Sequence, residues 1–480
     1  MKSKYIVAIE IGSSRIKGIV ASVDETASIC VLAVEEVDSG ECVRYGRVQN
    51  AREVAERVNE IIRRLENNPS VAPGRVSTVF IANGGRSLAS SFAEATLQQP
   101  GEAEITLQTL ERLHKEARYN LATDREVLAI APRHYFVDNT EVKKVVGAFG
   151  TVLKGEFTIM TCSPENRRAL DRVTVESQQK PVPRDYVTRL LAQTEMALTD
   201  SERQLGVVFV DFGAETTTTA VFRDGALQLA CTLPMGSANI TRDLCVGLST
   251  TAPTAENIKI TKGRAVAERV NINAPDAETR EVINYVSARA GEIIANINNL
   301  LADAGFKASE LPAGLVIAGG GARLQGFNEM LEAQTKLKVR PAAVDASIAM
   351  ACPGKSADHF DVISLVKYAA AHSDLNCVSM PEGAAAPAVT ATAAAPAAPR
   401  PDTAQGAYGR RVPMAEDDPG LLDDDLDQPA NVNESDAADE LPPQGSDAAA
   451  TRKSLLARLK KFSLNDWLRP PREEEEGMDE

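Results

Sequence analysis

The chain contains one short pattern twice, and this repeat limits the folds that it can adopt more than any other feature. The first copy runs from Val7 to Ser14, and the second runs from Val207 to Thr217. Each copy is a short apolar segment followed by an acidic residue that stands two positions before a glycine. A second segment with strand-forming residues follows each glycine. The pattern predicts a buried strand, a tight turn and another strand in each of two related lobes.

The chemistry of these two turns suits a nucleotide. Glycine lets the backbone come close to a phosphate, and successive N–H groups in a turn form a cradle for an anion. The acidic residues Glu10 and Asp211 are suited to hold Mg²⁺ through water. A single acid-x-Gly turn is more often an ordinary hairpin turn. Its repetition favours two lobes that grip one triphosphate between them.

Two further motifs are weaker when they are taken alone. The segment Ala313–Leu324 predicts a buried strand, then Gly319, Gly320 and Gly321, then a helix. Adenine or an α-phosphate would lie against that bare backbone, although a plain strand-to-helix turn explains the glycines equally well. Glu256 and Lys259 lie on one face of a predicted helix and would bond a ribose or an adenine edge. A solvated surface pair is the simpler interpretation of these two residues.

Composition excludes several classes of protein. The chain has 480 residues and a net charge of −15, which argues against non-specific nucleic-acid binding. Its seven cysteines form no C-x-x-C pair, so reduced thiols are favoured over a zinc site or a disulfide framework. The four histidines form no cluster with Cys or Asp that would make a triad or a metal site. We expect no signal peptide and no transmembrane segment.

Strand and helix signals alternate up to about residue 375, which predicts an α/β fold. Residues 51–66 have apolar residues at helical spacing and predict an amphipathic helix. Further elements are predicted at 76–82 (strand), 106–121 (helix), 127–131, 135–137 and 157–161 (strands) and 185–200 (helix). The elements between 84 and 160 predict a small inserted α+β module.

The last hundred residues change character. Residues 381–450 are rich in Ala, Pro, Asp and Gly, which predicts a disordered linker. Beyond it, Arg452–Leu468 has the pattern of an amphipathic helix in a membrane surface. The residues expected to touch lipid are Leu455, Leu456, Arg458, Leu459, Lys460, Lys461, Phe462, Trp467 and Leu468. The alternative is a helix that docks in a protein groove, but the long linker favours the membrane.

The order acid-x-Gly-Ser, Asp-x-Gly, Glu-x-x-Lys and Gly-Gly-Gly resembles the actin/Hsp70/sugar-kinase ATPase superfamily. More specifically, Gln193–Asp211, Leu233–Gly263 and His134–Asp138 with Val146 and Gly147 resemble the FtsA family of bacterial cell-division proteins. The likeness covers residues 1 to about 372 and returns at the C-terminus. It implies a two-lobed, actin-like α/β ATPase fold with a small inserted subdomain of the 1C type, a disordered linker and a C-terminal amphipathic helix.

The resemblance also implies domain limits. Residues 1–83 and 161–200 would form lobe I (IA), and 84–160 the inserted subdomain. Residues 201–375 would form lobe II (IIA), with subdomain IIB at about 236–303. The remainder would be a linker at 376–451, a membrane-targeting helix at 452–470 and an acidic tail at 471–480.

Site residues follow from the same resemblance. The nucleotide-binding set would be Gly12, Ser13, Ser14, Arg15, Asp211, Gly213, Thr216, Thr217, Gly236, Glu256, Lys259, Gly319, Gly320 and Gly321. ATP would bind with Mg²⁺ held through water by Glu10 and Asp211. The family's second turn typically reads D-x-G-G-G-T-T-D, whereas this chain has Ala214, Glu215 and Thr218 at three of those positions. A carboxylate facing phosphates repels them unless Mg²⁺ intervenes or the side chain turns away. We therefore expect slow hydrolysis at most, no catalytic residue and no metabolic activity.

The resemblance implies a scaffold that polymerises on the cytoplasmic face of the inner membrane at the division septum, as a peripheral protein. Its partners would be the FtsZ C-terminal tail, other copies of itself, anionic lipids and later division proteins, and not nucleic acid. Arg242, Lys259, Lys262 and Arg264 would meet the acidic tail peptide, or are ordinary surface charges. The alternatives are a pilus-assembly adaptor of the PilM type, a small-molecule kinase of the superfamily and an Hsp70-like chaperone.

Overall fold

The computed structural model describes residues 4–381, apart from 122, 178–181, 268–275, 353, 355 and 375, and the side chains of 182–185. The predicted amphipathic helix at 452–470, the acidic tail and nearly all of the predicted linker lie outside the described residues. The first residues of that predicted linker are ordered instead, because β19 (Val378–Ser379) pairs with β6 (Arg75–Val76).

The first sheet has six strands in the order β12-β7-β1-β2-β3-β18. Its strands are β1 (Lys4–Ile11), β2 (Arg15–Val23), β3 (Ile29–Asp38), β7 (Thr78–Asn83), β12 (Val182–Thr188) and β18 (Ala349–Met350). The hairpin β1–β2 is antiparallel, whereas β7 runs parallel to β1. This sheet therefore combines the beginning of the chain with segments that come much later.

Helices cover both faces of the first sheet. Gly18 on β2 packs against Ile61 of α1 (Ala51–Glu66), whereas its neighbour Lys17 pairs with Asp361 of α10 (Phe360–His372). Because adjacent residues of a strand point to opposite faces, α1 and α10 lie on opposite sides of the sheet. Alpha-helices α3 (Pro164–Glu176) and α4 (Arg189–Ala197) pack beside α1 and α10, respectively.

The second sheet has nine strands in the order β10-β9-β11-β8-β15-β14-β13-β16-β17. Its central strands are β13 (Val207–Phe212), β14 (Thr217–Arg223), β15 (Ala226–Leu233), β16 (Leu315–Ala318) and β17 (Val339–Pro341). Val208, Val210 and Phe212 face a core shared with α6 (Ser237–Gly247), α8 (Ala277–Asp303) and α9 (Phe327–Thr335). The short helix α5 (Asp200–Leu205) leads into β13, and α7 (Ala252–Lys262) packs on α6.

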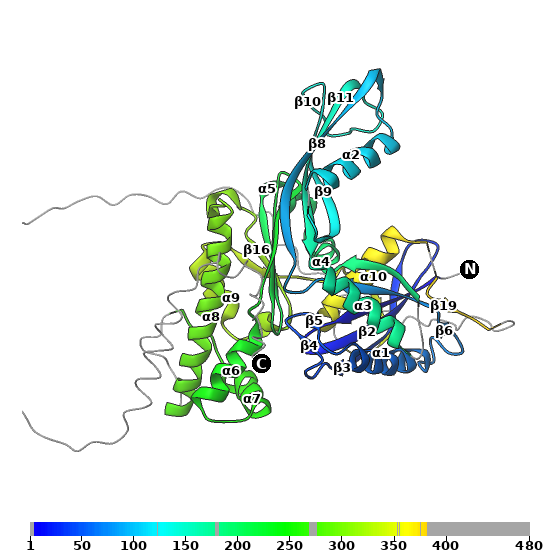
Figure 1. The fold of residues 1–480 in the computed structure, drawn as a ribbon. Helices are drawn as coiled ribbons and strands as arrows, with labels where there is room; N and C mark the ends of the chain where they lie inside the picture. The colour runs from blue at the N-terminus through cyan, green and yellow to red at the C-terminus, as the bar shows by residue number, and fades with distance from the viewer. Residues whose placement is uncertain are drawn as a thin grey trace, which may run out of the picture. The chain divides into compact units, whose positions relative to one another are not determined.

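The inserted module forms the other end of this second sheet (Figure 1). It consists of β8 (Ala89–Glu104), α2 (Leu107–Asn120), β9 (Glu126–Val137), β10 (Thr140–Glu141) and β11 (Phe149–Cys162). The module has its own core around Leu113, Leu153 and Phe157. A single backbone pair, Ala89 opposite Cys231, joins β8 to β15. The sequence predicted the module but not this continuous sheet.

Two of the predicted elements are confirmed in detail and one is wrong in part. The helix predicted at 51–66 is α1, and Thr106 and Thr109 form the capping box of α2. The helix predicted at 185–200 begins only at Arg189, because Val182–Thr188 pairs with β7 as a parallel strand. None of the helices in the described part of the chain combines the length and the apolar character needed to cross a membrane.

The remaining elements are short. They are β4 (Val43–Arg44), β5 (Arg47–Val48) and the 3₁₀ turns η1 (Ala308–Glu310), η2 (Gly320–Arg323) and η3 (Ser356–His359). The hairpin β4–β5 turns through Tyr45 and Gly46, which have φ of 52° and 67°. Positive φ at both central residues is the geometry of a type I′ turn.

Candidate functional site

The two repeated turns have the same backbone geometry. Gly12 N donates to Arg15 O over 3.1 Å, and Gly213 N donates to Thr216 O over 2.9 Å. A side chain on Gly12 would begin 2.8 Å from Arg15 O, and one on Gly213 would begin 3.0 Å from Thr216 O. Both turns therefore need glycine for the same physical reason, and the predicted repeat of strand, turn and strand is confirmed.

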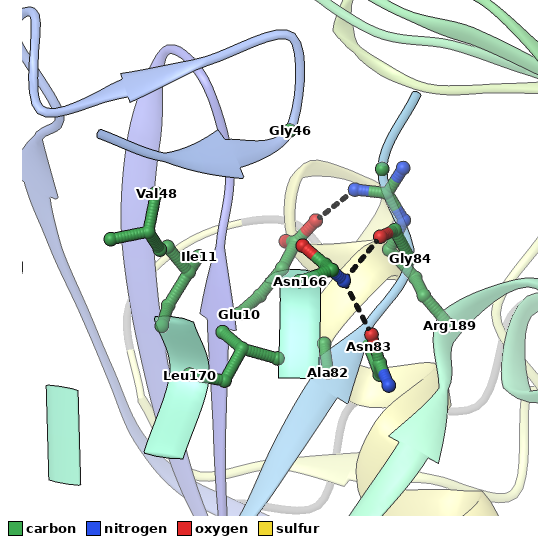
Figure 2. Close-up of a pocket in the computed structure, with 11 residues that line it drawn as sticks. Glu10, Ile11, Gly46, Val48, Ala82, Asn83, Gly84, Asn166, Leu170 and Arg189 are labelled. Carbon is green, nitrogen blue, oxygen red and sulfur yellow. Dashed lines mark hydrogen bonds and ion pairs between the residues drawn. The ribbon is translucent and has the colours of Figure 1, made fainter. Parts of the chain in front are cut away.

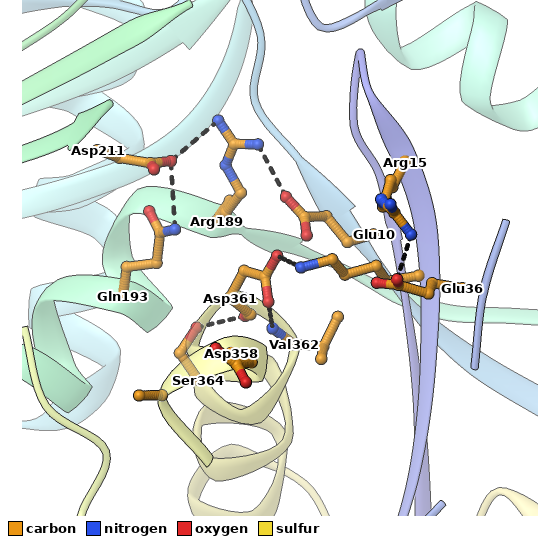
Figure 3. A network of polar contacts seen from close by, with 12 residues as sticks. Glu10, Arg15, Glu36, Arg189, Gln193, Asp211, Asp358, Asp361, Val362 and Ser364 are labelled. Carbon is orange, nitrogen blue, oxygen red and sulfur yellow. Dashed lines mark hydrogen bonds and ion pairs between the residues drawn. The ribbon is translucent and has the colours of Figure 1, made fainter. Parts of the chain in front are cut away.

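Arg189 connects the carboxylates that precede the two turns (Figure 3). Its Nη1 lies 3.0 Å from Glu10 Oε1, and its Nη2 lies 3.3 Å from Asp211 Oδ2. Glu10 and Asp211 are the second-last residues of β1 and β13, and Arg189 is the first residue of α4. All three side chains are mostly withdrawn from water, with 17% of the Arg189 side chain exposed.

A second ion pair lies on the other side of Glu10. Lys17 Nζ is 2.5 Å from Asp361 Oδ2, and Asp361 also accepts from the backbone N of Val362. Burial raises the pKa of Glu10 to about 8, and the charge of Asp361 adds to that rise. Burial acts in the same direction on Asp361, but Lys17 outweighs it and holds the pKa of Asp361 below its usual range.

Glu215, which stands in the second turn where the resemblance leads us to expect glycine, points toward the hairpin β4–β5. Its carboxylate accepts from Tyr45 N over 2.6 Å and lies 2.5 Å from Arg242 Nη2 and 3.1 Å from Arg44 Nε. Arg242 Nη1 also donates to the Tyr45 hydroxyl over 3.2 Å. The expected conflict with phosphates is thus reduced, because two arginines and a backbone N–H hold this carboxylate.

The glycines after β16 come against the second turn. Gly319 has φ of 90°, and a side chain on it would begin 2.4 Å from Phe212 O and 2.6 Å from Asp211 Oδ1. Gly321 lies against the Phe212 ring. Gly320 differs from both, since no described atom lies within 4 Å of the point where its side chain would start. This open backbone is the kind of surface on which a flat base can lie.

The predicted pair Glu256–Lys259 belongs to α7 and contacts the first turn of α6 through a hydrogen-bond network. Lys259 Nζ is 2.7 Å from Glu256 Oε2 and donates to Thr241 Oγ1 over 3.0 Å and to Ser237 O over 3.2 Å. Lys259 is 7% exposed, whereas the Glu256 side chain is 46% exposed, so the lysine alone departs from the simpler interpretation of a solvated surface pair. Gly236 lets α6 begin directly on the second turn, where Ser237 N donates to Gly213 O over 3.0 Å.

Other predicted site residues make contacts of their own. Ser13 Oγ accepts from Gly46 N over 2.7 Å, and the carbonyl of Ser14 accepts from Ser39 N over 3.0 Å. Arg15 pairs with Glu36 of β3. The buried hydroxyl of Thr217 donates to Met235 O over 2.7 Å, and Thr216 is also buried. Asp211, Gly213, Gly236, Lys259 and Gly319 are thereby linked around the second turn.

A small cavity lies beside Glu10 and Arg189 (Figure 2). Its volume is about 20 Å³, which is room for one water molecule. Asn166 of α3 lines it and donates to Asn83 Oδ1 over 2.7 Å and to Gly84 O over 2.9 Å. The cavity touches none of the residues predicted to hold phosphates, so it is not a nucleotide pocket.

Sequence reasoning missed Arg189 and Gln193. Gln193 lies one helical turn after Arg189, donates to Asp211 Oδ2 over 3.2 Å and is 1% exposed. In the described structure its Oε1 is buried without a hydrogen-bond partner. One signal was available: two acidic residues at the ends of buried strands require a basic partner, and Arg189 is a basic residue in an otherwise apolar stretch.

The residues of the predicted nucleotide site are better arranged to bind a nucleoside than to bind a metal ion. At the end of the site predicted to hold the nucleoside, the Gly320 backbone is open and Glu256 and Lys259 are paired. At the other end, the guanidinium of Arg189 lies between the two carboxylates expected to hold Mg²⁺. Among the residues that the structure describes, no group of three His, Cys, Asp or Glu side chains is arranged to hold a metal ion.

The basic residues predicted to meet an acidic peptide are engaged within the chain. Arg242 is paired with Glu215, Lys259 with Glu256, and Lys262 with Glu278 over 2.8 Å.

Two sequence profiles match the chain. The profile described as "Cell division protein FtsA" matches residues 208–372, and the one described as "SHS2 domain inserted in FTSA" matches residues 85–161. Their ranges correspond to the second lobe with α10 and to the inserted module.

Curated relatives and solved structures agree with these profiles. The cell-division protein FtsA of Porphyromonas gingivalis is 26% identical over 366 residues, covering 73% of this chain and 75% of the relative. That of Neisseria meningitidis is 27% identical over 360 residues, covering 71% and 84%. The solved "PilM-PilN type IV pilus biogenesis complex" has a TM-score of 0.55 at 15% identity, covering 76% of this chain and 96% of the other. The fold is therefore a mixed α/β, actin-like fold with an SHS2 insert.

Proposed function

We propose a scaffolding role in cell division for this chain because it belongs to the FtsA family of bacterial cell-division proteins. The family membership gives the division role. The finer parts of the proposal are an adenine nucleotide in the site, attachment to the inner membrane face at the septum through 452–470, polymerisation, tethering of FtsZ filaments by their C-terminal tails and recruitment of later division proteins. The observation that carries the nucleotide is the pair of matching glycine turns.

Three features of the described residues support ATP as the nucleotide. The turns at Gly12 and Gly213 are closed by the glycine N–H groups onto Arg15 O and Thr216 O, and tight turns of this kind can cradle an anion with their other N–H groups. The α6 N-terminus lies on the second turn, where Gly213 O and Ala214 O accept from Ser237 N and Ala238 N, and the positive end of its helix dipole favours an anion there. Gly320 leaves open backbone beside Asp211 and Gly319 for the base. ATP binding would stabilise the folded chain by mass action and favour the polymerising conformation.

Gly320→Leu tests the nucleotide. The new side chain would fill the space left for the base without meeting a described atom at its root, so we expect nucleotide affinity to fall by about tenfold or more while the fold is kept. Calorimetry with ATP would measure it. Gly101→Leu is the matched control, because Gly101 in the insert also has open space around it. Equal ATP affinity of both variants would show that Gly320 does not contact the nucleotide.

We expect this chain to hydrolyse ATP slowly. Ala214 and Glu215 replace glycines of the family's second turn, and Glu215 is held by Arg44 and Arg242. No side chain near the turns is assigned as a general base. A phosphate-release assay gives the rate directly, and turnover at the pace of a metabolic kinase would contradict this part of the proposal.

Leu459→Glu tests the membrane and the FtsZ tether together. Leu459 shares the apolar face of the predicted helix with Leu455 and Phe462, so a charge there would abolish pelleting with anionic liposomes. FtsZ filaments would then no longer co-sediment with the liposomes. Leu464→Glu is the control, since Leu464 lies on the opposite face at 100° per residue. If Leu459→Glu pelleted normally, the membrane proposal would fail.

The pilus-assembly alternative shares the fold with the PilM–PilN complex at 15% identity. Binding of an FtsZ-tail peptide by the purified chain separates the two, because only the division scaffold requires it.

A further inference from the structure

We propose that the guanidinium of Arg189 replaces a divalent cation in this site, so that the chain binds its nucleotide without magnesium. This inference rests on the proposed function, since it concerns how the same site holds phosphates. It departs from the expectation drawn from the sequence, in which Glu10 and Asp211 hold Mg²⁺.

The position of Arg189 is the first support. Glu10 and Asp211 stand two residues before Gly12 and Gly213, and Arg189 bridges the two carboxylates over 3.0 and 3.3 Å. Figure 3 shows the guanidinium between the two carboxylates. Mg²⁺ takes near-octahedral oxygen ligands at about 2.0–2.1 Å and dehydrates reluctantly. A metal ion in the same place would have to displace a cation that both carboxylates already bind.

The charges around the turns are the second support. Four carboxylates and four basic side chains lie around the turns in three sets of ion pairs: Glu10 and Asp211 with Arg189, Asp361 with Lys17, and Glu215 with Arg44 and Arg242. Their formal charges cancel when every group is ionised, and the raised pKa of Glu10 reduces the negative charge further. A cluster of uncompensated carboxylates would require a divalent cation before phosphates could approach, but this set carries its own counter-charges.

The chemistry of the group is the third support. Guanidinium is planar and permanently charged, and its N–H groups match phosphate oxygens in pairs. It is also fixed in place, because Arg189 begins α4 directly after the paired strand β12. Gln193 lies one turn along the same helix and donates a hydrogen bond to Asp211. In the described structure its Oε1 is buried without a hydrogen-bond partner. Arg189 is therefore a positioned cation and not a mobile surface charge.

The wild-type chain gives the primary test. Calorimetry of ATP binding in excess EDTA and in excess Mg²⁺ should give dissociation constants within about threefold of each other. A loss of about tenfold or more in EDTA would overturn the inference and leave the proposed function standing. No binding in either buffer would instead overturn the proposed function.

Arg189→Gln sharpens the test. Freed carboxylates would accept a metal, so affinity in EDTA should fall by about tenfold or more and Mg²⁺ should restore much of it. Arg340→Gln is the control: Arg340 pairs with Glu202 away from the turns, and its loss should leave the metal dependence unchanged.

If Arg189→Gln does not fold, Arg189→Lys is the second variant, because it keeps the positive charge but lacks the planar guanidinium. Affinity for ATP in EDTA should then drop while the fold, read by circular dichroism, is kept. An Arg189 variant that folds and binds ATP equally well in both buffers contradicts the inference.

Discussion

Single residues decide how the second turn of this chain differs from its family's pattern. Glu215 stands in a turn where a carboxylate would be expected to repel phosphates. Its carboxylate instead accepts from the Tyr45 backbone and pairs with Arg44 and Arg242. The substitution for glycine therefore adds a contact between the second turn and the hairpin β4–β5. The outcome follows from where the side chain points, which no sequence pattern specifies.

Glu215→Gln should measure this contact. The amide keeps the size of the side chain but leaves two arginines without their buried anion, so the free energy of unfolding should fall by about 1–3 kcal/mol. Urea denaturation would give the value. Glu41→Gln, which removes an exposed partner of Arg44, should cost about 0.5 kcal/mol or less. Because Glu215 and Arg242 are in contact, adding Arg242→Gln should cost less than the sum of both single changes. Strict additivity would argue against the ion pair.

At the scale of elements, the inserted module is a small unit with a core of its own. Phe157 of β11 is fully buried and packs edge-on against His114 of α2 and Tyr135 of β9. Three side-chain contacts reinforce the single backbone pair that joins the module to β15, and one of them is from the Thr158 hydroxyl to Leu227 O. Arg133 donates to Gln228 O over 2.7 Å, and Ser90 Oγ accepts from Ala230 N over 2.7 Å. We expect the module to lose its own structure without unfolding the rest of the chain.

Phe157→Ala tests this expectation. Removing a buried aromatic ring typically costs about 3–5 kcal/mol, which should abolish amide protection in β8, β9 and β11. Protection in β1 and β13 should persist in hydrogen exchange followed by mass spectrometry. Phe92→Ala removes a half-exposed ring from the same sheet and should change stability by about 1 kcal/mol or less. Loss of protection throughout the chain would show one cooperative unit.

The sequence predicted elements whose signals are local. Helix α1 has apolar residues at helical spacing, α2 has the Thr106–Thr109 cap, and the hairpins at Gly12 and Gly213 carry their glycines. It failed for β12, which precedes α4 without a break and is fixed only by pairing with β7.

Within the site, the glycines and the Glu256–Lys259 pair could be predicted from the sequence as a pattern. Arg189 could not, because its role depends on two carboxylates brought together from β1 and β13. Long-range pairings of this kind are visible only after folding.

At the scale of the whole described chain, the first sheet depends on the last helix. Helix α10 buries Phe360, Val362, Ile363, Leu365 and Val366 against the core that contains β1 and β2. Strand β18 adds to the edge of β3. The N-terminal strands thus lack one covering layer until residues 349–372 are present.

A chain that ends at residue 341 should show this dependence. It lacks β18 and α10, so we expect dye binding to exposed apolar surface and weak amide protection in β1–β3. Protection in β13, β14 and β16 should be closer to that of a chain ending at residue 381. Full protection of β1–β3 in the shorter chain would contradict the dependence.

This closing helix has a consequence during synthesis. Translation proceeds at about 5–20 residues per second, so the first strands wait on the order of tens of seconds for their cover. Throughout that interval the nascent apolar hairpin of β1 and β2 lacks α10, and a ribosome-associated chaperone would have time to bind it. The order of synthesis and the order of folding therefore differ in this chain, because the first strands are completed only by residues 349–372.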